Sequence, residues 1–562
     1  GLDRDYITQW SYGIDETWTL LIPNVKGGAS VPLAANETAM EKANPEFYPI
    51  YQQIGQYWGE QPGTSGPVYV GAFVLMLFVL GLFIVKGPMK WALFAATVLS
   101  ILLSWGRNFM PFTDFFLDYV PLYAKFRTVA SILVIAEFTI PLLAMMALRR
   151  IVEDPQVLTR NMRWVYVSFG LTAGVALLFA LMPGFFFQDF ISSSERVALG
   201  QIPDEYRHAL MANLTEMRQA VMTADCWRSF WIVTVGVVML LLYRINKLKA
   251  AYMIAGVGVL CLVDMWQVNK RYLNDGMFVE KSVREAPQPM SHTDQLILKD
   301  KGLDYRVLNL ATNTFNENET SYYHKSIGGY HAAKLRRYQE MIEAYINPQM
   351  SRIMKAVADS DGDMTRVNGD SLFPVLNMLN TKYIIVPLQG GQTVPLLNPY
   401  AYGNAWFVDR LTFADNANQE IERIGQIDLR HEAVADKRFA DVLGEAVAQD
   451  KNSVAKLLAY EPNQLTYEVS SDKGGVLVFS EVYYPGWTAT IDGQPAELGR
   501  VNYILRALRV PAGKHQVKLA FFPKSVDTTE TIAYVAYVVL LLIIVGGLYD
   551  TWRRKKNNQT TH

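Results

Sequence analysis

Ionisable and aromatic side chains that could carry chemistry lie at the edges of long apolar segments in this chain. The first 65 residues combine aromatic rings with charge at Trp10, Tyr12, Glu16 and Lys26. Rings that stack on the CH faces of sugars, with polar groups that fix hydroxyls, are typical of carbohydrate sites. We therefore treat Trp10, Tyr12 and Lys26 as candidate sugar-binding residues and Glu16 as a candidate acid. The alternative is an interfacial aromatic belt with a solvated acid.

Other ionisable groups lie in or beside apolar segments. Glu137 falls near the middle of segment 128–148, where an ionisable group is costly and is usually functional or paired. Asp264 lies near the end of another apolar segment, and we expect it to pair with Lys270 or Arg271. The short segment 106–127 also holds Arg107, Asp114, Asp118, Lys125 and Arg127.

Several classes of function have no support in the sequence. No HExxH, paired CxxC, Walker loop or GxSxG occurs, so nothing favours a metalloprotease, a nucleotide hydrolase or a serine hydrolase. Cys226 and Cys261 fall at or inside apolar segments and give neither a disulfide framework nor zinc spacing, so we predict no metal site from them. The net charge of −1 does not favour nucleic acid as a partner.

Seven apolar segments are candidate membrane spans, because a bilayer core needs roughly 20 apolar residues. They are residues 66–85, 91–105, 128–148, 164–183, 228–243, 251–268 and 531–548. The chain is 51% apolar and yet 19% charged, which indicates membrane spans joined to a water-soluble part.

Basic residues between the spans predict their orientation, since cytoplasmic loops carry an excess of Lys and Arg. If the basic tail 551–562 is cytoplasmic, alternation places every short basic loop on the same side. These loops contain Lys86, Lys90, Arg149, Arg150, Arg160, Arg163, Arg244, Lys247 and Lys249. The segments expected outside are 1–65, 106–127, 186–227 and 270–527.

The extracytoplasmic part is expected to hold folded structure. Residues 270–454 mix strand patterns (305–311 and 381–388) with a helix pattern (335–346), and residues 455–527 alternate as a β-sandwich, a module that often binds sugars. Hairpin turns are predicted at Asp492-Gly493 and at Pro511-Ala512-Gly513. An amphipathic helix near 203–223 is expected along the outer membrane surface, and a final span is expected over 528–550.

The predicted fold is thus an α-helical polytopic membrane bundle of about seven spans (membrane domain 66–269), a large extracytoplasmic α/β region and a C-terminal β-sandwich.

A family resemblance extends over essentially the whole chain. The run VYYPGWTATIDGQPAELGRVNYILRALRVPAGKHQVKLAFFP (482–523) closely resembles the end of YfhO-family bacterial membrane proteins. Further similar stretches are QWSYG…LLIPNVKGG (9–28), YWGEQPGTSGPVYVG (57–71), SWGRNF (104–109), PLYAKFR (121–127), DMWQVNKRYL (264–273), SIGGYHAAKLRRYQ (326–339) and LNMLNTKYIIV (376–386).

This resemblance implies a GT-C-type polytopic glycosyltransferase of the bacterial cytoplasmic membrane. Such an enzyme takes a sugar from a polyprenyl-phosphate carrier and transfers it, outside the cytoplasm, to a cell-envelope glycan or polymer. The implied partners are the lipid-linked sugar, the glycan acceptor and the bilayer; a divalent cation is left open. Full-length members begin with further spans, so the catalytic acid is expected in a portion before Gly1.

The implied reaction gives the candidate residues roles. Arg107, Lys125 and Arg127 would contact the donor phosphate, because Arg and Lys stabilise a leaving phosphate. Asp114 and Asp118 would serve as bases on the acceptor side. Tyr330 and His331 would reach toward the membrane site and contact sugar. The alternatives are interfacial snorkelling for the cations, helix capping or Arg pairing for the acids, and a structural role for the histidine.

Two competing functions remain open: a transporter or flippase of a lipid-linked glycan, and a non-catalytic envelope-assembly protein.

Overall fold

The computed structural model describes residues 3–64, 66–200, 202–285, 288–331, 333–360, 362–445 and 453–559. The chain divides into two compact units, Gly1–Glu280 and Lys281–His562. We describe each unit by itself.

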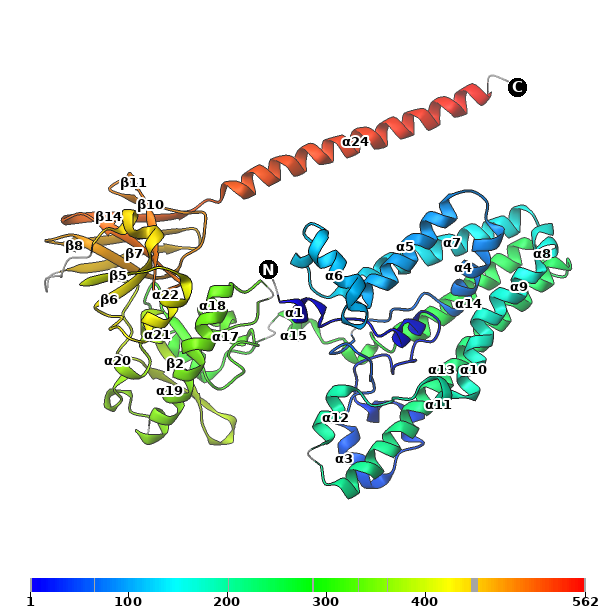
Figure 1. Ribbon diagram of the computed structural model, residues 1–562, viewed down its shortest axis with the longest axis horizontal. Helices are drawn as coiled ribbons and strands as arrows, with labels where there is room; N and C mark the ends of the chain where they lie inside the picture. The colour runs from blue at the N-terminus through cyan, green and yellow to red at the C-terminus, as the bar shows by residue number, and fades with distance from the viewer. Residues whose placement is uncertain are drawn as a thin grey trace. The chain divides into compact units, whose positions relative to one another are not determined.

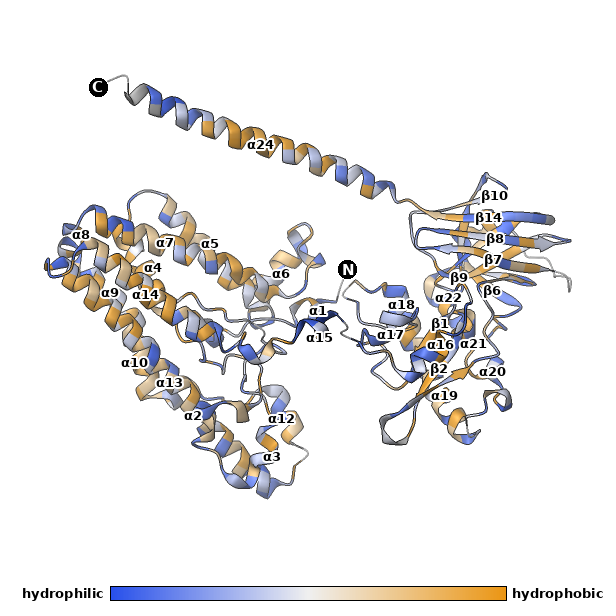
Figure 2. Ribbon diagram, turned by 180° about the vertical axis from the view of Figure 1, so that it is seen from behind, coloured by the Kyte–Doolittle hydropathy of each residue, from blue (hydrophilic) through white to orange (hydrophobic). Residues whose placement is uncertain are grey.

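The first unit is a bundle of helices whose apolar faces are extensive (Figures 1 and 2). Its longer helices are α4 (Ala72–Ile84), α5 (Met89–Ser104), α6 (Met110–Tyr119), α7 (Val134–Glu153), α9 (Met162–Phe169), α10 (Val175–Leu181), α13 (Asp204–Arg244) and α14 (Ala250–Asn269). Its shorter helices are α1 (Arg4–Thr8), α2 (Glu37–Met40), α3 (Tyr48–Tyr51), α8 (Gln156–Arg160), α11 (Pro183–Phe186) and α12 (Ser193–Leu199). A π-helical turn, Gly170–Gly174, joins α9 to α10.

Helix α4 lies at the centre of the bundle, and α7 packs along it. Its side chains Phe73, Met76 and Leu80 are almost fully buried. Gly81 makes close packing possible, because a Cβ there would lie 3.1 Å from the Leu143 side chain on α7. Small residues at a helix interface allow two backbones to approach in this way.

The number of described helices that are long and apolar enough to cross a membrane is lower than the seven spans expected. Five helices are long and apolar enough to cross a bilayer, and the bent pair Met89–Ser104 and Gly106–Tyr119 would make a sixth. The five are Val129–Glu153, Met162–Leu181, Asp204–Arg244, Ala250–Asn269 and Lys524–Arg554. Helix α4 has 13 residues, so it is about 20 Å long and too short to cross alone. The expected span 66–85 begins instead with non-helical chain up to Gly71.

The loops of the first unit are gathered at two ends of the bundle. At the basic end, which holds loops 86–90, 149–163 and 244–249, Phe83 stacks on Trp164 with ring centroids 3.9 Å apart, and Arg244 Nε donates to Thr159 Oγ1. At the loop end, segment 3–64 contacts loop 106–127 and the region around Asp225. The loops therefore divide as the charge pattern requires; which end is cytoplasmic stays a prediction.

The helix expected over 203–223 does not lie separately on the membrane surface, because α13 continues without a break into the next span. In Figure 1, α13 runs from beside α3 and α12 to the end of the bundle where α8 lies. No proline interrupts residues 204–244, so nothing in the sequence ends the helix. Leu210 and Leu214 pack against Leu33 and Phe47, not against lipid.

The second unit begins with an α/β region around a small sheet. Parallel strands β1 (Arg306–Asn309) and β2 (Thr381–Pro387) and the antiparallel β3 (Thr393–Leu397) form it. Its helices are α15 (Lys281–Glu285), α16 (His292–Ile297), α17 (Glu319–Tyr323), α18 (Arg336–Met341), α19 (Asn347–Asp359), α20 (Gly369–Leu372) and α21 (Pro374–Met378). The strands expected over 305–311 and 381–388 are confirmed as β1 and β2, and the helix expected over 335–346 is α18 followed by a π-helical turn.

Two further sheets enclose a separate apolar core. The five-stranded sheet has the order β11-β10-β14-β8-β7, and the six-stranded sheet has the order β4-β9-β13-β12-β6-β5. The strands are β4 (Ala405–Val408), β5 (Arg410–Ala414), β6 (Glu432–Asp436), β7 (Val454–Glu461), β8 (Gln464–Ser471), β9 (Gly475–Val482), β10 (Trp487–Ile491), β11 (Gln494–Ala496), β12 (Leu498–Val501), β13 (Leu505–Val510) and β14 (Gly513–Phe521). Helices α22 (Ala417–Ile424) and α23 (Ala440–Leu443) accompany the strands. The sandwich therefore includes strands from residues 405–436, before the expected start at 455.

The two predicted turns have different outcomes. Asp492 and Gly493 both have positive φ and join the antiparallel pair β10 and β11, as a two-residue hairpin requires. The hairpin predicted at Pro511-Ala512-Gly513 is wrong, because β13 and β14 belong to different sheets. That turn carries the chain from one layer of the sandwich to the other.

Helix α24 (Lys524–Gln559) follows β14 directly. Its most apolar stretch has no buried share within the structure, and Figure 2 shows this apolar stretch with polar residues toward both ends. An exposed apolar helix of this length suits a membrane span.

Candidate functional site

Segment 3–64 is held against the helices at the loop end by backbone hydrogen bonds. Tyr12 N donates to Ser104 O at 2.8 Å, and Ala130 N donates to Trp10 O at 3.1 Å. Asn24 N donates to Asp225 Oδ2 at 2.9 Å. These contacts place the predicted residues Trp10, Tyr12, Glu16 and Lys26 beside the ends of the apolar helices.

Glu16 lies in a 3₁₀ helix, Asp15–Leu20, and only 2% of it is exposed. Tyr57 Oη donates to its Oε1 at 2.6 Å, and Gly13 N donates to its Oε2 at 3.1 Å. Longer bonds come from Glu60 N and Gln61 Nε2. Burial raises the pKa of the Glu16 carboxyl, while hydrogen bonds from Tyr57 and Gly13 lower it in part.

Lys26 and Tyr12 lie beside Glu16, but the hollow between them is small. Lys26 Nζ forms an ion pair with Asp15 Oδ2 at 2.6 Å. The hollow they line with Tyr57 has a volume of about 20 Å³, which is about the space of one water molecule. Four donors already serve the Glu16 carboxylate. In this conformation the cluster therefore holds segment 3–64 in place and does not admit a sugar.

The candidate residues of loop 106–127 pair within the loop end. Arg107 donates to Glu60 O at 2.6 Å, and the backbone N–H of Glu60 in turn donates to Glu16. Asp114 and Asp118 both accept from Arg4, the latter at 2.6 Å, and not from Arg107. Arg4 lies in α1, 110 and 114 residues before the two aspartates, so the sequence alone does not suggest this contact.

The remaining two cations of this loop differ from each other. Arg127 bonds to Tyr6 Oη and lies 5.5 Å from the centroid of its ring. Lys125 is exposed in a 3₁₀ turn, Tyr123–Lys125. The three cations assigned to the donor phosphate are thus not brought together around one described cavity.

A cavity that sequence reasoning missed opens at the loop end between α13 and the chain that follows α14. It has a volume of about 490 Å³, and three cations line it: Arg228, Lys270 and Arg271. Asp225 is the one carboxylate among its described lining residues, and Asn24 and Gln56 add amide groups. We call this the cation pocket.

Each cation of the pocket is paired with a carboxylate. Arg271 donates to Asp225 Oδ2 and Oδ1 at 2.6 and 2.7 Å, and Lys270 pairs with the exposed Asp275 at 2.7 Å. Arg228 pairs with Asp264, while its Nη1 is buried and has no hydrogen-bond partner among the described residues. A buried guanidinium nitrogen without a partner favours an anionic acceptor.

Asp264 does not pair with Lys270 or Arg271 as expected. It faces the bundle from α14, accepts from Tyr69 Oη at 2.9 Å and from Ala72 N at 3.2 Å, and pairs with Arg228. The carboxylate thereby accepts a hydrogen bond from the first turn of α4, where backbone N–H groups lack helical partners.

Glu137 lies in the first turn of α7 and is partly buried. The preceding residues Val129–Leu133 form a 3₁₀ helix, so Glu137 is nearer the loop end than a position in mid-span.

Tyr330 and His331 lie in the second unit. Both are exposed, and His331 Nδ1 accepts from Ala333 N at 3.0 Å. Their role toward a membrane site stays a prediction. Cys226 and Cys261 are free. Across the described ranges, no group of three or more His, Cys, Asp or Glu side chains is arranged to hold a metal ion.

Part of this chain is similar to known proteins. Residues 427–533 match the family model described as "Bacterial membrane protein YfhO". A stretch of 132 residues is 24% identical to "Uncharacterized protein YfhO" of Bacillus subtilis (strain 168). That stretch is 24% of this chain and spans 14% of the length of the relative. No solved structure matches.

Proposed function

Because the chain belongs to the YfhO family of bacterial membrane proteins, we propose that it is a membrane glycosyltransferase. Its donor is a sugar on a polyprenyl-phosphate carrier, and its acceptor is a cell-envelope glycan on the extracytoplasmic face. The acceptor hydroxyl oxygen attacks the anomeric carbon, the bond from that carbon to the phosphate oxygen breaks, and polyprenyl phosphate leaves. A carboxylate takes the hydroxyl proton.

One observation carries the proposal: the cation pocket adjoins helices that are apolar enough to span a membrane. Arg228 lies on α13 just before its most apolar part, and Lys270 and Arg271 follow the last residue of α14. A polyprenyl-phosphate sugar needs its chain in lipid and its phosphate at the interface. A pocket with three cations beside the ends of candidate spans supports the second requirement.

The chemistry of the pocket also suits the leaving group. Guanidinium and ammonium groups stabilise the negative charge that grows on the phosphate as the glycosidic bond breaks. Arg271 and Arg228 are already oriented by Asp225 and Asp264, so little reorganisation accompanies donor binding. Asn24 Oδ1 is buried without a hydrogen-bond partner among the described residues and could accept from a sugar hydroxyl, whereas the Gln56 amide is already bonded to Asn36 and Gly27.

The test is sugar transfer by membranes that contain the full chain, supplied with a radiolabelled polyprenyl-phosphate hexose. The variant Lys270→Gln removes one pocket cation whose partner, Asp275, is exposed and stays solvated. We expect the KM for the donor to rise about tenfold with a smaller change in kcat, since the contact exists before and during the reaction.

Lys247→Gln is the matched control, because Lys247 is exposed at the opposite end of the bundle. It should leave both constants unchanged. Equal KM values for the two variants would contradict the assignment of the pocket. Absence of transfer by the parent protein, with the labelled donor bound, would favour the flippase or envelope-assembly alternatives.

A further inference from the structure

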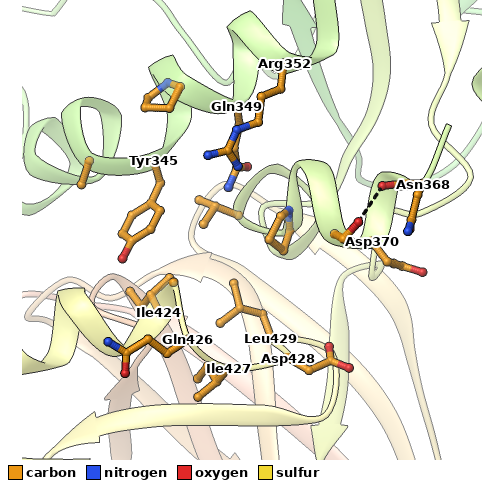
Figure 3. Close-up of a pocket in the computed structure, with 16 residues that line it drawn as sticks. Tyr345, Gln349, Arg352, Asn368, Asp370, Ile424, Gln426, Ile427, Asp428 and Leu429 are labelled. Atoms are coloured by element: carbon orange, nitrogen blue, oxygen red, sulfur yellow. Dashed lines mark hydrogen bonds between the residues drawn. The ribbon is translucent and has the colours of Figure 1, made fainter. Parts of the chain in front are cut away.

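The second unit contains a cavity of about 560 Å³ beside the β-sandwich and outside residues 455–527. One wall comes from Tyr345 and α19, the second from residues 368–375, and the third from the segment 424–429 between α22 and β6. Figure 3 shows Gln349 and Arg352 pointing from α19 into the cavity, toward Ile424 and Leu429. We call it the α19 pocket. Its volume lies within the range of small-ligand sites.

An amide donor in the α19 pocket has no protein partner among the described residues. Gln349 as a whole is only 2% exposed, and its Oε1 accepts from Leu376 N at 3.2 Å. Its Nε2 makes no hydrogen bond to the residues that the structure describes and is not closed off from the cavity, so it is open to water or to a ligand. A ligand with a hydrogen-bond acceptor at this point would replace that water.

The rim of the α19 pocket carries both donors and acceptors. Arg352 offers N–H donors on one side, and Asp370 and Asp428 lie on another side in Figure 3. Two carboxylates disfavour an anionic ligand, and the Arg352 guanidinium offsets one of the two charges that would attract a cation. A purely apolar ligand would leave the Gln349 amide N–H without a hydrogen-bond partner. The remaining class is uncharged and rich in groups that both donate and accept, which describes hydroxyls.

The walls between these polar groups are apolar. The Tyr345 hydroxyl donates to Ile421 O at 2.6 Å, so the aromatic ring is free to form an apolar wall of the pocket. Pro348, Pro374 and Leu429 continue that surface. Gly425 allows the third wall to approach, because a Cβ there would lie 3.1 Å from Tyr345 Oη. An aromatic and aliphatic wall beneath polar groups matches the CH faces and hydroxyl edges of a sugar ring.

We infer that the α19 pocket binds an uncharged oligosaccharide of about two or three sugar units. The inference concerns binding alone and stands whether or not the proposed transferase activity is found. It also differs from the expectation for the sandwich: the pocket lies outside residues 455–527.

Saturation-transfer NMR on the full chain in detergent tests the inference, with a panel of neutral di- and trisaccharides built from glucose, galactose and N-acetylglucosamine. We expect at least one to bind with a Kd below about 1 mM. Arg352→Ala removes a rim donor and Ser371→Trp fills the cavity from its exposed edge. Both should weaken binding about tenfold or more.

Lys355→Ala is the control, because Lys355 is also exposed on α19 but does not line the pocket. It should bind like the parent. Binding that survives both Arg352→Ala and Ser371→Trp, in variants that melt at the parent temperature, would overturn the inference. So would the absence of binding by every saccharide of the panel.

Discussion

Arg271 donates hydrogen bonds to both carboxylate oxygens of Asp225, at 2.6 and 2.7 Å, and so joins the chain after α14 to the middle of α13. The Asp225 side chain is 5% exposed and also accepts from Asn24 N. Three stretches distant in sequence therefore meet at one carboxylate. That carboxylate forms a wall of the cation pocket and fixes the orientation of one of its cations.

Replacing Asp225 tests how much this junction stabilises the first unit. Asp225→Ala leaves the Arg271 guanidinium unpaired and the Asn24 N–H without its acceptor, so we expect a loss of about 3 kcal/mol in unfolding free energy. Thermal unfolding in detergent measures it. Asp275→Ala removes the exposed partner of Lys270 and should cost less than about 1 kcal/mol. Equal losses would refute the role of the junction.

Arg218 gives a second stability prediction. Its side chain is fully buried and donates to Phe190 O and Gly55 O, each at 2.7 Å, and to both oxygens of Glu195. An ammonium cannot reproduce this fork, so Arg218→Lys should cost about 2 kcal/mol. Arg207→Lys makes the same change at a more exposed position of α13 and should melt near the parent. A parent-like melting temperature for Arg218→Lys would show the fork to be dispensable.

Glu16 should make stability depend on pH. Its pKa is raised by burial, so the folded state holds the proton more tightly than the unfolded chain does. The resulting stability is present at low pH and is lost as the pH rises through the raised pKa. We expect the melting temperature of the parent, relative to Glu16→Gln, to increase as the pH falls from about 7 toward the ordinary value of 4.5.

The exposed Glu41 is the control for that titration. Glu41→Gln should follow the pH profile of the parent throughout. A difference between the parent and Glu16→Gln that stays flat, or shrinks as the pH falls, would count against a buried carboxyl with a raised pKa.

Orientation is testable by cysteine labelling in intact cells. With Cys226 and Cys261 replaced, Asp275→Cys reports on the loop end and Lys247→Cys on the basic end. Because basic loops stay in the cytoplasm, a membrane-impermeant maleimide should label position 275 in intact cells and position 247 only after lysis. The reverse pattern would invert the predicted topology.

Features that depend on a few adjacent residues could be predicted from the sequence. Apolar length predicted the five helices that are long and apolar enough to be spans. Asp492-Gly493 predicted its hairpin, because positive φ at both positions is a local requirement. The start of helix α4 was harder to predict. Residues 66–71 are largely apolar but not helical, and their composition does not distinguish them from helix.

Features that depend on tertiary contacts could not be predicted in this way. Whether Pro511-Ala512-Gly513 turns within a sheet or between sheets depends on which strand β14 meets. The partner of Asp264 is set by the packing of α13 on α14, which brings Arg228 nearer than the sequence neighbours Lys270 and Arg271. The cation pocket combines residues from positions 24 to 274, so no single stretch of the sequence predicted it.

Donor binding is the most direct test of the central claim, that the cation pocket holds the phosphate of a lipid-linked sugar. The measurement is the Kd of a polyprenyl-phosphate hexose for the full chain in nanodiscs, with Lys270→Gln and Lys247→Gln compared side by side. Loss of one charge-assisted contact should weaken binding to Lys270→Gln about tenfold or more, while Lys247→Gln binds like the parent. Equal affinity of all three proteins for the donor would contradict the claim.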